Sequence, residues 1–558
     1  MAYVVTQSCC ADASCVVACP VNCIHPAPGE PGFGSTEMVY IDATTCVGCG
    51  ACATACPVGA TVPDAALTSK QLPFIDLNAA YYDLFPHADR TPVALVPQQR
   101  RLTRTGPFRV AVIGAGPAGL YTADELLKHP EVEGVDVYDR LRTPHGLVRH
   151  GVAPDHASTK LVTRLFEAIE RQPRFRYFLG TDVGTEVTLA DLRASYHAVV
   201  YAVGASADRM LGIPGEDLAG SVPATALVGW YNGHPDQQEL DVPLGHERAV
   251  VVGNGNVALD VARILTRPME VLERTDLAPD ALERLRDSAV REVVVLGRRG
   301  PAQAAFTVPE LIGLAALDDV DVLVDCDPTL LDGEDQRSQL LRELAARTPD
   351  PASERRRIVL SFAVSPVEVL GADGRVTGVR VARNRLVADA DGVVRAETTG
   401  DEHVLDAGLV VRSVGHRGLP VADLPFDERT ATVPHHAGRV EPGVYVVGWI
   451  KRGPVGFIGT NKTCAQETVE TILDDLDAGL PDPAGSLASA ASLVRERSPE
   501  ATDLGGWQRI DAAEREQGAA VGRPRAKVTD PAAQRAIAAV PPVARRRGIL
   551  RRTVSLTP

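Results

Sequence analysis

The chain has 558 residues, of which 45% are hydrophobic and 23% are charged, and its formal net charge is −15. This length predicts three or four compact units, and no apolar run approaches the ~20 residues that a membrane-spanning helix needs. The acidic balance argues against a general nucleic-acid binder, which needs a basic surface. The first residues lack the basic and apolar stretches of a secretory signal. We expect a cytoplasmic protein with no membrane or nucleic-acid partner.

The N-terminal segment, residues 1–62, is rich in cysteine, with nine of the eleven cysteines between Cys9 and Cys56. The run Cys-x2-Cys-x2-Cys-x3-Cys-Pro that ends at Pro57 is typical of bacterial ferredoxins, in which the fourth cysteine binds the other of two clusters. An upstream Cys-x3-Cys-Pro that ends at Pro20 repeats the second half of this run. A duplicated fold with two iron-sulfur clusters is therefore predicted. The exchange assigns a 4Fe-4S cluster to Cys46, Cys49, Cys52 and Cys19, and the other cluster to Cys56, Cys15 and Cys9.

The second of these groups lacks an obvious fourth thiolate. Residues 2–9 and 19–23 resemble the seven-iron ferredoxins, whose first cluster is 3Fe-4S, although the interval after Cys9 is shorter here. Cys10 or Asp12 as a fourth ligand would make this cluster 4Fe-4S, so both nuclearities stay open. Cys23 is interpreted as a small buried residue beside a cluster. The alternatives for the whole run are a zinc site, whose paired CxxC spacing is looser, and a disulfide-stapled domain, which belongs to oxidising compartments.

Residues 63–106 contain five prolines and little periodicity, and we interpret them as a linker. Apolar strands then alternate with helical segments, which is typical of a doubly wound α/β fold. The strand Val110–Ile113 leads into a GxGxxG turn and a helix, and the next strand ends in an acidic residue that can bond a ribose hydroxyl. The glycines let the backbone approach a pyrophosphate at the helix N-terminus. No group for a 2′-phosphate follows, so the turn is predicted to bind FAD through Gly114, Ala115, Gly116, Gly119 and Asp139.

A second turn of this kind, GxGxxA, follows the strand at 249–252. Here the next strand, 293–296, ends in two arginines instead of an acidic residue, and two guanidinium groups at that place can pair with a 2′-phosphate. We attribute the long interval between the two features to an inserted helical segment around 275–286. A solvated basic turn is the alternative interpretation. The predicted NADP contacts are Asn254, Gly255, Asn256, Val257, Arg298 and Arg299.

The first turn together with Thr143–His156 resembles the adrenodoxin-reductase type of ferredoxin-NADP reductase, and the similarity runs from about residue 107 to 474. With the cysteine-rich head, the chain resembles the actinobacterial fused ferredoxin/ferredoxin-NADP reductases. The resemblance implies an α/β protein with two Rossmann-like domains of the glutathione-reductase type beside a small α+β two-cluster ferredoxin domain. The NADP domain, 209–407, would be inserted between the two parts of the FAD domain, 107–208 and 408–480. We expect residues 481–558 to be a peripheral tail.

The resemblance also implies roles for single residues. His156 is the catalytic candidate, as the group that orients the nicotinamide, with a purely structural histidine as the alternative. Asp139 stands where the family usually has Glu. Gly313 stands where the family often has a second acidic residue, so no role is carried over to that position. The implied FAD contacts are Leu147, Trp449, Gly456, Phe457 and Ile458, and the further NADP contacts are Arg209, Glu310 and Gly456. Core packing is the alternative for Trp449.

These features predict an FAD-dependent ferredoxin-NADP reductase, because a flavin converts between the hydride of NADPH and the single electrons of iron-sulfur clusters. An external ferredoxin or a haem-thiolate monooxygenase is the expected electron acceptor. Two alternatives come from other classes. One is an electron-transfer subunit of a larger oxidoreductase, like the small subunit of glutamate synthase. The other is a non-enzymatic carrier that senses the redox state of NADP.

Overall fold

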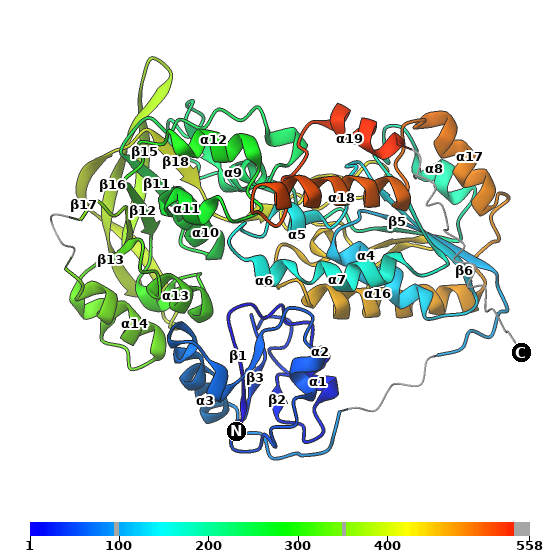
Figure 1. Ribbon diagram of the computed structural model, residues 1–558, viewed down its shortest axis with the longest axis horizontal. Coiled ribbons are helices and arrows are strands. Elements are labelled where there is room, and N and C mark those ends of the chain that lie inside the picture. Colours follow the sequence, from blue (N-terminus) through cyan, green and yellow to red (C-terminus); the bar gives the residue numbers. More distant parts are fainter. Residues whose placement is uncertain (94–99, 349–352, 541–558) are drawn as a thin grey trace, which may run out of the picture.

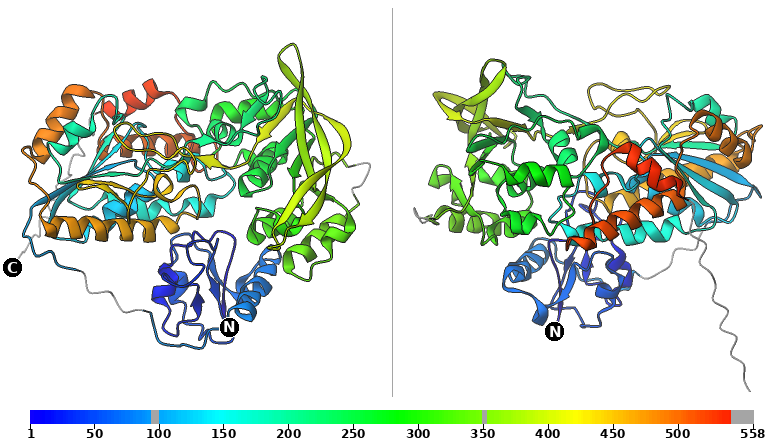
Figure 2. Two further views of the ribbon diagram at one scale, coloured as in Figure 1. Left: turned by 180° about the vertical axis from the view of Figure 1, so that it is seen from behind. Right: turned by 45° about the horizontal axis from the view of Figure 1, so that its top comes forward.

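The computed structural model describes residues 1–93, 100–348 and 353–540, and consists of a small head and a two-domain body (Figure 1). The head, drawn in blue, lies against both domains of the body, and the two views of Figure 2 agree on this placement. None of the helices in these residues combines the length and the apolar character that a membrane crossing requires.

The head is built from two similar halves. In each half a residue with a left-handed backbone, Ala13 (φ 59°) or Gly50 (φ 77°), precedes a five-residue helix that ends at an extended cysteine followed by proline. The repeated spacing in the sequence is thus a repeated backbone conformation. Two short antiparallel strand pairs complete the fold. The elements are β1 (Tyr3–Val5), α1 (Ser14–Ala18), β2 (Ile24–His25), β3 (Tyr40–Ile41), α2 (Ala51–Ala55) and β4 (Thr61–Pro63).

The expected linker begins later than the sequence suggested, because α3 (Pro73–Leu84) lies inside it and packs on the head. The Asn78 amide oxygen accepts hydrogen bonds from the backbone of Val5 (3.2 Å) and Ile41 (2.9 Å), and Phe74 is buried. Pro73 is the first residue of the helix, where proline is well tolerated. The proline that we interpreted as a sign of a linker therefore marks a helix start.

The first body domain has a six-stranded sheet in the order β20-β21-β8-β5-β6-β7, in which only β20 is antiparallel to its neighbour. Two helices far apart in the sequence, α4 (Pro117–Leu127) and α16 (Thr460–Ala478), pack against each other beside this sheet. The strands are β5 (Phe108–Ile113), β6 (Val132–Asp139), β7 (Phe175–Leu179), β8 (Ala198–Tyr201), β20 (Arg439–Glu441) and β21 (Val444–Val446). The shorter helices are α5 (Gly146–His150), α6 (Ala157–Lys160), α7 (Thr163–Glu170), α8 (Leu189–Arg193) and α15 (Trp449–Arg452).

The second body domain is inserted in the first and has a parallel sheet in the order β10-β18-β11-β12-β14-β13. Its strand β18 (Leu409–Arg412) is fully buried and pairs with β11, so this domain extends past the expected boundary at 407. The apolar run of β18 is that of an interior parallel strand, which explains its place. The other strands are β10 (Ser221–Pro223), β11 (Arg248–Val252), β12 (Glu292–Gly297), β13 (Asp321–Asp325) and β14 (Arg357–Phe362). The helices are α9 (Ala224–Tyr231), α10 (Asn256–Thr266), α11 (Met269–Leu272), α12 (Pro279–Arg286), α13 (Val308–Ala315) and α14 (Gln336–Ala345).

Two smaller sheets accompany the second body domain. An antiparallel sheet of three strands projects from it (Figure 1), and a two-stranded ribbon lies where the chain passes between the two domains. The strands of the larger sheet are β15 (Val364–Ala372), β16 (Arg375–Ala388) and β17 (Val394–Asp406), and those of the ribbon are β9 (Ala207–Asp208) and β19 (His416–Arg417).

The C-terminal segment up to residue 540 is an integral part of the body and not a peripheral tail. It forms α17 (Leu487–Arg497), α18 (Leu504–Ala520) and α19 (Pro531–Ala539). Trp507, Ile510 and Glu514 on one face of α18 are buried. Their spacing of three and four residues is a helical periodicity that the sequence analysis missed. The remainder of the expected tail, 541–558, lies outside the described residues.

Glu514 joins this segment to the first body domain. Its fully buried carboxylate accepts two hydrogen bonds from Arg149 (2.6 and 2.9 Å) and one from Arg525 (2.9 Å). Removing one member of a buried ion pair costs about 3–5 kcal/mol, because a buried charge is left uncompensated. We expect Glu514→Gln to lower the free energy of unfolding by about 3 kcal/mol in denaturant titrations. Glu516→Gln, exposed on the same helix, is the control, and equal stability of the two variants would contradict the expectation.

Candidate functional site

Four of the predicted metal ligands, Cys19, Cys46, Cys49 and Cys52, line one cavity of the head. The cavity encloses about 270 Å³ of empty space, including its opening to solvent. Cys23 lines it as well and is buried, with its sulfur 3.4 Å from that of Cys19. Thiols that converge on a common space are the donor set that a 4Fe-4S cluster requires, so the residues fit this group.

The other predicted ligands, Cys9, Cys15 and Cys56, form a second group on the opposite ends of the two short helices. Burial, together with the nearby Cys56 and Asp12, raises the pKa of Cys9 to about 12. Burial likewise raises the pKa of Cys15. The charged groups that face these thiols are acidic, and a bound metal cation is what would stabilise the thiolates. Backbone N–H groups already point at two of the sulfurs, from Ala11 to Cys9 (3.4 Å) and from Ala60 to Cys56 (3.2 Å).

Either of the two predicted fourth ligands lies near this second group. Cys10 is buried, and the pKa of its thiol is raised first by burial and then by the charges of Asp12, Cys9 and Cys56. Asp12 is also buried and hydrogen-bonds to Ser14. The structure thus brings both candidates to the group.

The first glycine turn adopts the form that a dinucleotide site needs. A Cβ on Gly114 (φ 110°) would lie 2.4 Å from the Ala202 carbonyl oxygen, and one on Gly119 would lie 1.9 Å from the Gly114 oxygen. The Asp139 carboxylate, at the end of β6, accepts a hydrogen bond from Ala115 N (2.8 Å). Burial raises the pKa of Asp139. The turn and the predicted ribose contact are therefore adjacent, as the sequence spacing implied.

The second glycine turn lies beside the predicted arginine pair. Strands β11 and β12 are neighbours, and a Cβ on Gly297 would lie 2.5 Å from the Asn254 amide nitrogen. Arg298 is exposed and Arg299 half-buried, and within the described part of the chain neither guanidinium has a hydrogen bond or an ion pair. Asn254 and Asn256 accept hydrogen bonds from Ala305 N (3.4 Å) and Thr307 N (2.9 Å). Two unpaired cations beside a glycine turn fit a nucleotide that carries a 2′-phosphate.

The loop before α16 returns to the first glycine turn. Gly448 (φ 76°) approaches so closely that a Cβ there would lie 2.6 Å from the Ala118 Cβ. Trp449 is half-buried, and its ring centroid is 5.1 Å from that of His416. Val455 and Leu147 are unusually exposed for large apolar residues, at 59% and 43%. Half-buried residues 456–458 lie in the same loop.

His156 and Glu310 lie in an ion network centred on Arg263, which is buried. The Arg263 guanidinium donates to Asp155 (2.8 Å), Asp260 (2.7 Å) and Glu310 (3.4 Å), and its Nη2 also donates to His156 Nε2 (2.7 Å). Burial alone would raise the pKa of Asp155, but the charge of Arg263 lowers it well below its usual range. His156, Asp260 and Glu310 could together hold a metal by distance. Because the Arg263 guanidinium already hydrogen-bonds to all three side chains, we interpret this cluster as an ion network and not as a metal site.

Arg209, the remaining predicted NADP contact, lies apart from this network. Its side chain is exposed, and its backbone N–H donates to Gly415 O (3.0 Å) at the ribbon between the domains. The sequence did not indicate the role of Arg263, whose charge is balanced by Asp260 on the same helix and by Asp155 and Glu310 from distant segments. The available signal was the position of Arg263 among the apolar residues of α10. A buried arginine requires charged partners, so this position could have indicated the ion network.

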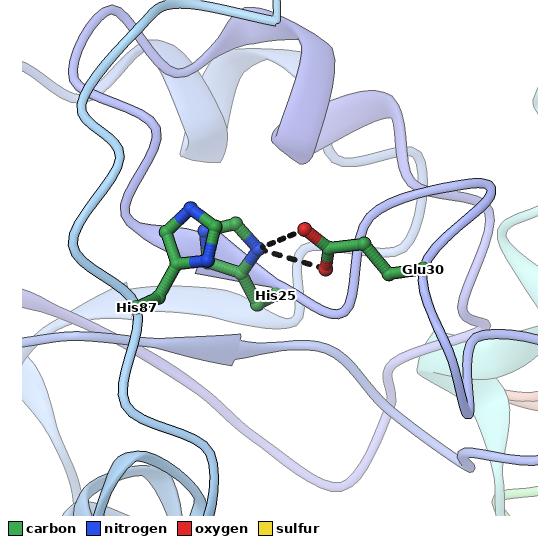
Figure 3. Close-up of side chains that lie close together, drawn as sticks. All are labelled: His25, Glu30 and His87. Carbon is green, nitrogen blue, oxygen red and sulfur yellow. Dashed lines mark hydrogen bonds and ion pairs between the residues drawn. The ribbon is translucent and has the colours of Figure 1, made fainter.

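A second cluster with metal-ligand chemistry, His25, Glu30 and His87, lies in the head (Figure 3). His25 is buried and its Nδ1 bonds to Glu30 (2.9 Å), while its Nε2 bonds to the Asn22 carbonyl oxygen (3.1 Å). The His87 ring stacks on it with 3.6 Å between centroids. Both ring nitrogens of His25 lie within hydrogen-bond distance of oxygen atoms of the head, so each already has a partner within the protein. We interpret this cluster as structural.

Comparisons with known proteins agree with this arrangement. Residues 108–295 match the pyridine nucleotide-disulphide oxidoreductase family, and residues 8–60 and 38–84 match 4Fe-4S dicluster domains. The chain is 49% identical to a probable ferredoxin/ferredoxin-NADP reductase of Mycobacterium leprae over 98% of this chain and all of that protein. The chain belongs to the ferredoxin/ferredoxin-NADP reductase family. The predicted family, fold class and enzyme type are thereby confirmed.

Relatives without the head match the body alone. The NADPH-ferredoxin reductase FprA of Mycobacterium tuberculosis is 46% identical over 76% of this chain and 97% of its own length. Its solved structure in complex with NADPH covers 77% of this chain and 99% of that chain, with a TM-score of 0.73. The body of this reductase is thus a complete FprA-like unit to which the head has been added.

The head places one of its own acids against the network of Arg263. Glu37 has a buried carboxylate oxygen without a partner in the described residues, and it faces Glu310 and Arg337. Burial, followed by the charge of Glu310, raises the pKa of Glu37 to about 8. The neutral carboxyl is therefore favoured in the folded protein.

This shift predicts how stability depends on pH. The contribution of Glu37 is fully present below the ordinary glutamate pKa of about 4.3 and is lost as the pH rises towards 8, because the unfolded chain ionises first. We expect the difference in melting temperature between Glu37→Gln and the unmodified protein to grow in favour of the variant from pH 5 to pH 8. Glu30→Gln, whose parent carboxyl has a lowered pKa, is the control. A pH-independent difference for Glu37→Gln would show that the carboxyl is already ionised.

Proposed function

We propose that this chain takes electrons from NADPH, passes them through FAD to two iron-sulfur clusters in its own head, and delivers them to an external ferredoxin or a haem-thiolate monooxygenase. The observation that carries the proposal is the direct contact between the head and the loop that ends at Gly459, with the backbone N–H of Gly459 donating to the Cys10 carbonyl oxygen (2.8 Å). FAD, when bound, would supply the conversion between a two-electron hydride and single electrons. The expected location is the cytoplasm.

The first body domain supplies the residues that would hold FAD. Gly114, Gly116 and Gly119 leave room for the pyrophosphate, and Asp139 would bond a ribose hydroxyl. Leu147, Trp449 and the backbone of Gly456, Phe457 and Ile458 would lie against the isoalloxazine, as the family resemblance implies. The exposure of Leu147 and Val455 supports this role, because large apolar side chains at a site are commonly covered by a ligand.

The second body domain supplies the residues that would hold NADP. Arg298 and Arg299 would bind the 2′-phosphate, and the turn from Asn254 to Val257 would face the pyrophosphate. Arg209, Glu310 and Gly456 are proposed as further contacts on the family resemblance. For His156 we propose a positioning role, because its Nε2 already accepts a hydrogen bond from Arg263.

Two clusters are proposed for the head, each held by three or four thiolates from both halves of the duplicated fold. One is a 4Fe-4S cluster on Cys19, Cys46, Cys49 and Cys52. The other is held by Cys9, Cys15 and Cys56, as 3Fe-4S or, with Cys10 or Asp12, as 4Fe-4S. Low-temperature EPR of the oxidised protein decides between them, because an oxidised three-iron cluster is paramagnetic and an oxidised 4Fe-4S cluster of this type is not.

The test of the function is an anaerobic titration with NADPH and, separately, NADH. Flavin absorbance and the EPR signals of the clusters are followed together. We expect NADPH to bleach the flavin at far lower concentration than NADH, with cluster signals following. A flavin that neither nucleotide reduces would refute the proposal, and reduction of added ferredoxin or of a haem-thiolate monooxygenase identifies the acceptor.

A further inference from the structure

The head meets the body at two glycines, one in each body domain. Gly459 of the first domain contacts the backbone of the head loop at residues 10–12, and a Cβ on it would lie 2.1 Å from the Ala11 carbonyl oxygen. Gly313 of the second domain contacts a side chain of the head, and a Cβ on it would lie 2.4 Å from the Gln7 amide nitrogen. We call these two contacts the head interface.

Neither glycine is required by its own backbone. Gly459 has φ −69° and ψ −26°, which any residue adopts, and Gly313 lies within the helix α13. Glycine inside a helix costs about 1 kcal/mol relative to alanine. The close approach of the head accounts for both positions. A methyl group on Gly459 would collide with the backbone of the head, whereas one on Gly313 would displace the end of the Gln7 side chain and its hydrogen bond to Glu310.

Polar and apolar contacts continue this interface. The Gln7 amide donates to Glu310 (3.2 Å), and the Gln336 amide donates to the Pro73 carbonyl oxygen (2.9 Å). Cys10 of the head, Tyr121 of the first domain and Ile312 of the second belong to one buried apolar cluster. A salt bridge between Lys70 and Asp318 (3.1 Å) is exposed and adds little.

The interface also fixes the orientation of the head. The loop that carries Cys9 faces Gly459, which directly follows the proposed flavin contacts 456–458. Cys10, Ala11 and Asp12 are buried there, at 3%, 1% and 6% exposure. In the group formed by Cys19, Cys46, Cys49 and Cys52, by contrast, Cys49 is exposed to solvent, and the nearby Val47 is 61% exposed.

We propose that Gly459 and Gly313 form a built-in docking site that holds the head in this orientation. The cluster ligands that include Cys9 then lie on the side of the proposed flavin contacts 456–458, and the cluster ligands that include Cys49 lie on the side of the solvent. The proposal rests on the proposed function for its redox meaning, whereas the docking itself depends only on the contacts above. The head then acts as a fixed partner of the body and does not swing on the segment that follows α3.

The experiment compares Gly459→Ala and Gly313→Ala in the full-length, cofactor-loaded protein. Both changes suit a helical backbone, so loss of docking, and not loss of helix, is what they report. Gly245→Ala is the matched control, because nothing lies within 4 Å of a Cβ at that glycine.

One NADPH, oxidised to NADP⁺ with release of one proton, supplies two electrons, one for each cluster of the head.

Two readouts are measured. Small-angle X-ray scattering gives the radius of gyration, which we expect to increase in Gly459→Ala, to increase less in Gly313→Ala and to stay unchanged in the control. Stopped-flow spectroscopy with NADPH gives the rates of flavin bleaching and cluster reduction. We expect the ratio of cluster reduction to flavin bleaching to fall at least about tenfold in Gly459→Ala, as misplacement of reacting groups predicts, and by a smaller factor in Gly313→Ala.

Gly459 adjoins the proposed flavin contacts, so Gly459→Ala could also change the rate of flavin reduction. For this variant the rate of cluster reduction is therefore divided by the rate of flavin reduction in the same protein, and the radius of gyration is compared with that of the control. An unchanged radius of gyration together with normal cluster reduction in both variants would overturn the docking proposal. Failure of NADPH to bleach the flavin of the unmodified protein would refute the proposed function instead, and the scattering comparison would still decide the docking.

Discussion

Replacing Arg298 and Arg299 together with alanine is expected to raise the KM for NADPH by at least about 100-fold and to leave that for NADH nearly unchanged. A hydrogen bond to a charged group contributes about 1.5–3 kcal/mol. Two such bonds to a 2′-phosphate are then worth at least about 3 kcal/mol, or a factor of about 100. Neither guanidinium has a hydrogen bond or an ion pair in the described residues, so the substitution breaks no polar side-chain contact within the fold.

The comparison of the two nucleotides makes this test specific, because NADH lacks the 2′-phosphate. The rate of flavin bleaching is measured against nucleotide concentration for each. Arg383→Ala is a suitable control, since Arg383 is exposed on β16 of the same domain and its side chain has no partner in the described part of the chain. An equal loss with NADPH and NADH would mean that the arginines support the domain and do not read the phosphate.

The sequence predicts those parts of the protein that depend on short-range patterns. Both glycine turns, the acid at the end of β6 and the duplicated cysteine runs are local spacings, and the structure brings each set together. The confirmed fold class follows from them, since a glycine turn between a strand and a helix specifies a parallel α/β unit.

The features that the sequence did not reveal depend on contacts between distant segments. Arg263 is balanced by acids from α10, α13 and the segment before α6, and Glu514 is balanced by Arg149, which lies 365 positions away. Apart from Asp260, which lies one helical turn before Arg263, these partners are far apart in the sequence, and no local spacing records them. The α3 helix was missed for a different reason, because its N-terminal proline was interpreted as part of a linker.

The role of Gly313 also became clear only from the structure. The sequence showed that this position lacks the acidic residue common in the family, which removed a role without suggesting another. In the fold, Gly313 contacts Gln7 of the head, and the carboxylates of Glu310 and Glu37 already lie near it. A further carboxylate there would repel that of Glu310 at a buried interface. The departure from the family pattern is thus consistent with the addition of the head.

Gly119→Ala is expected to abolish stable FAD binding, with the dissociation constant raised by at least about 100-fold, which corresponds to about 3 kcal/mol. The new methyl group would lie 1.9 Å from the Gly114 carbonyl oxygen and 3.3 Å from a methyl carbon of Val112. Both neighbours belong to the buried strand and the turn, so the turn itself must move. Overpacking of this kind also lowers the free energy of unfolding by about 1–3 kcal/mol.

Gly116→Ala separates binding from folding. Its methyl group would meet only the Gly146 Cα, at 3.7 Å, which is an ordinary contact. We therefore expect Gly116→Ala to fold with normal stability and yet to bind FAD more weakly, because the second glycine of the turn is where the backbone approaches the pyrophosphate. FAD content from absorbance and the melting temperature of the apoprotein are measured for both variants. Normal FAD content in Gly116→Ala would place the pyrophosphate elsewhere, and normal content in Gly119→Ala would show that the turn can shift without loss of the site.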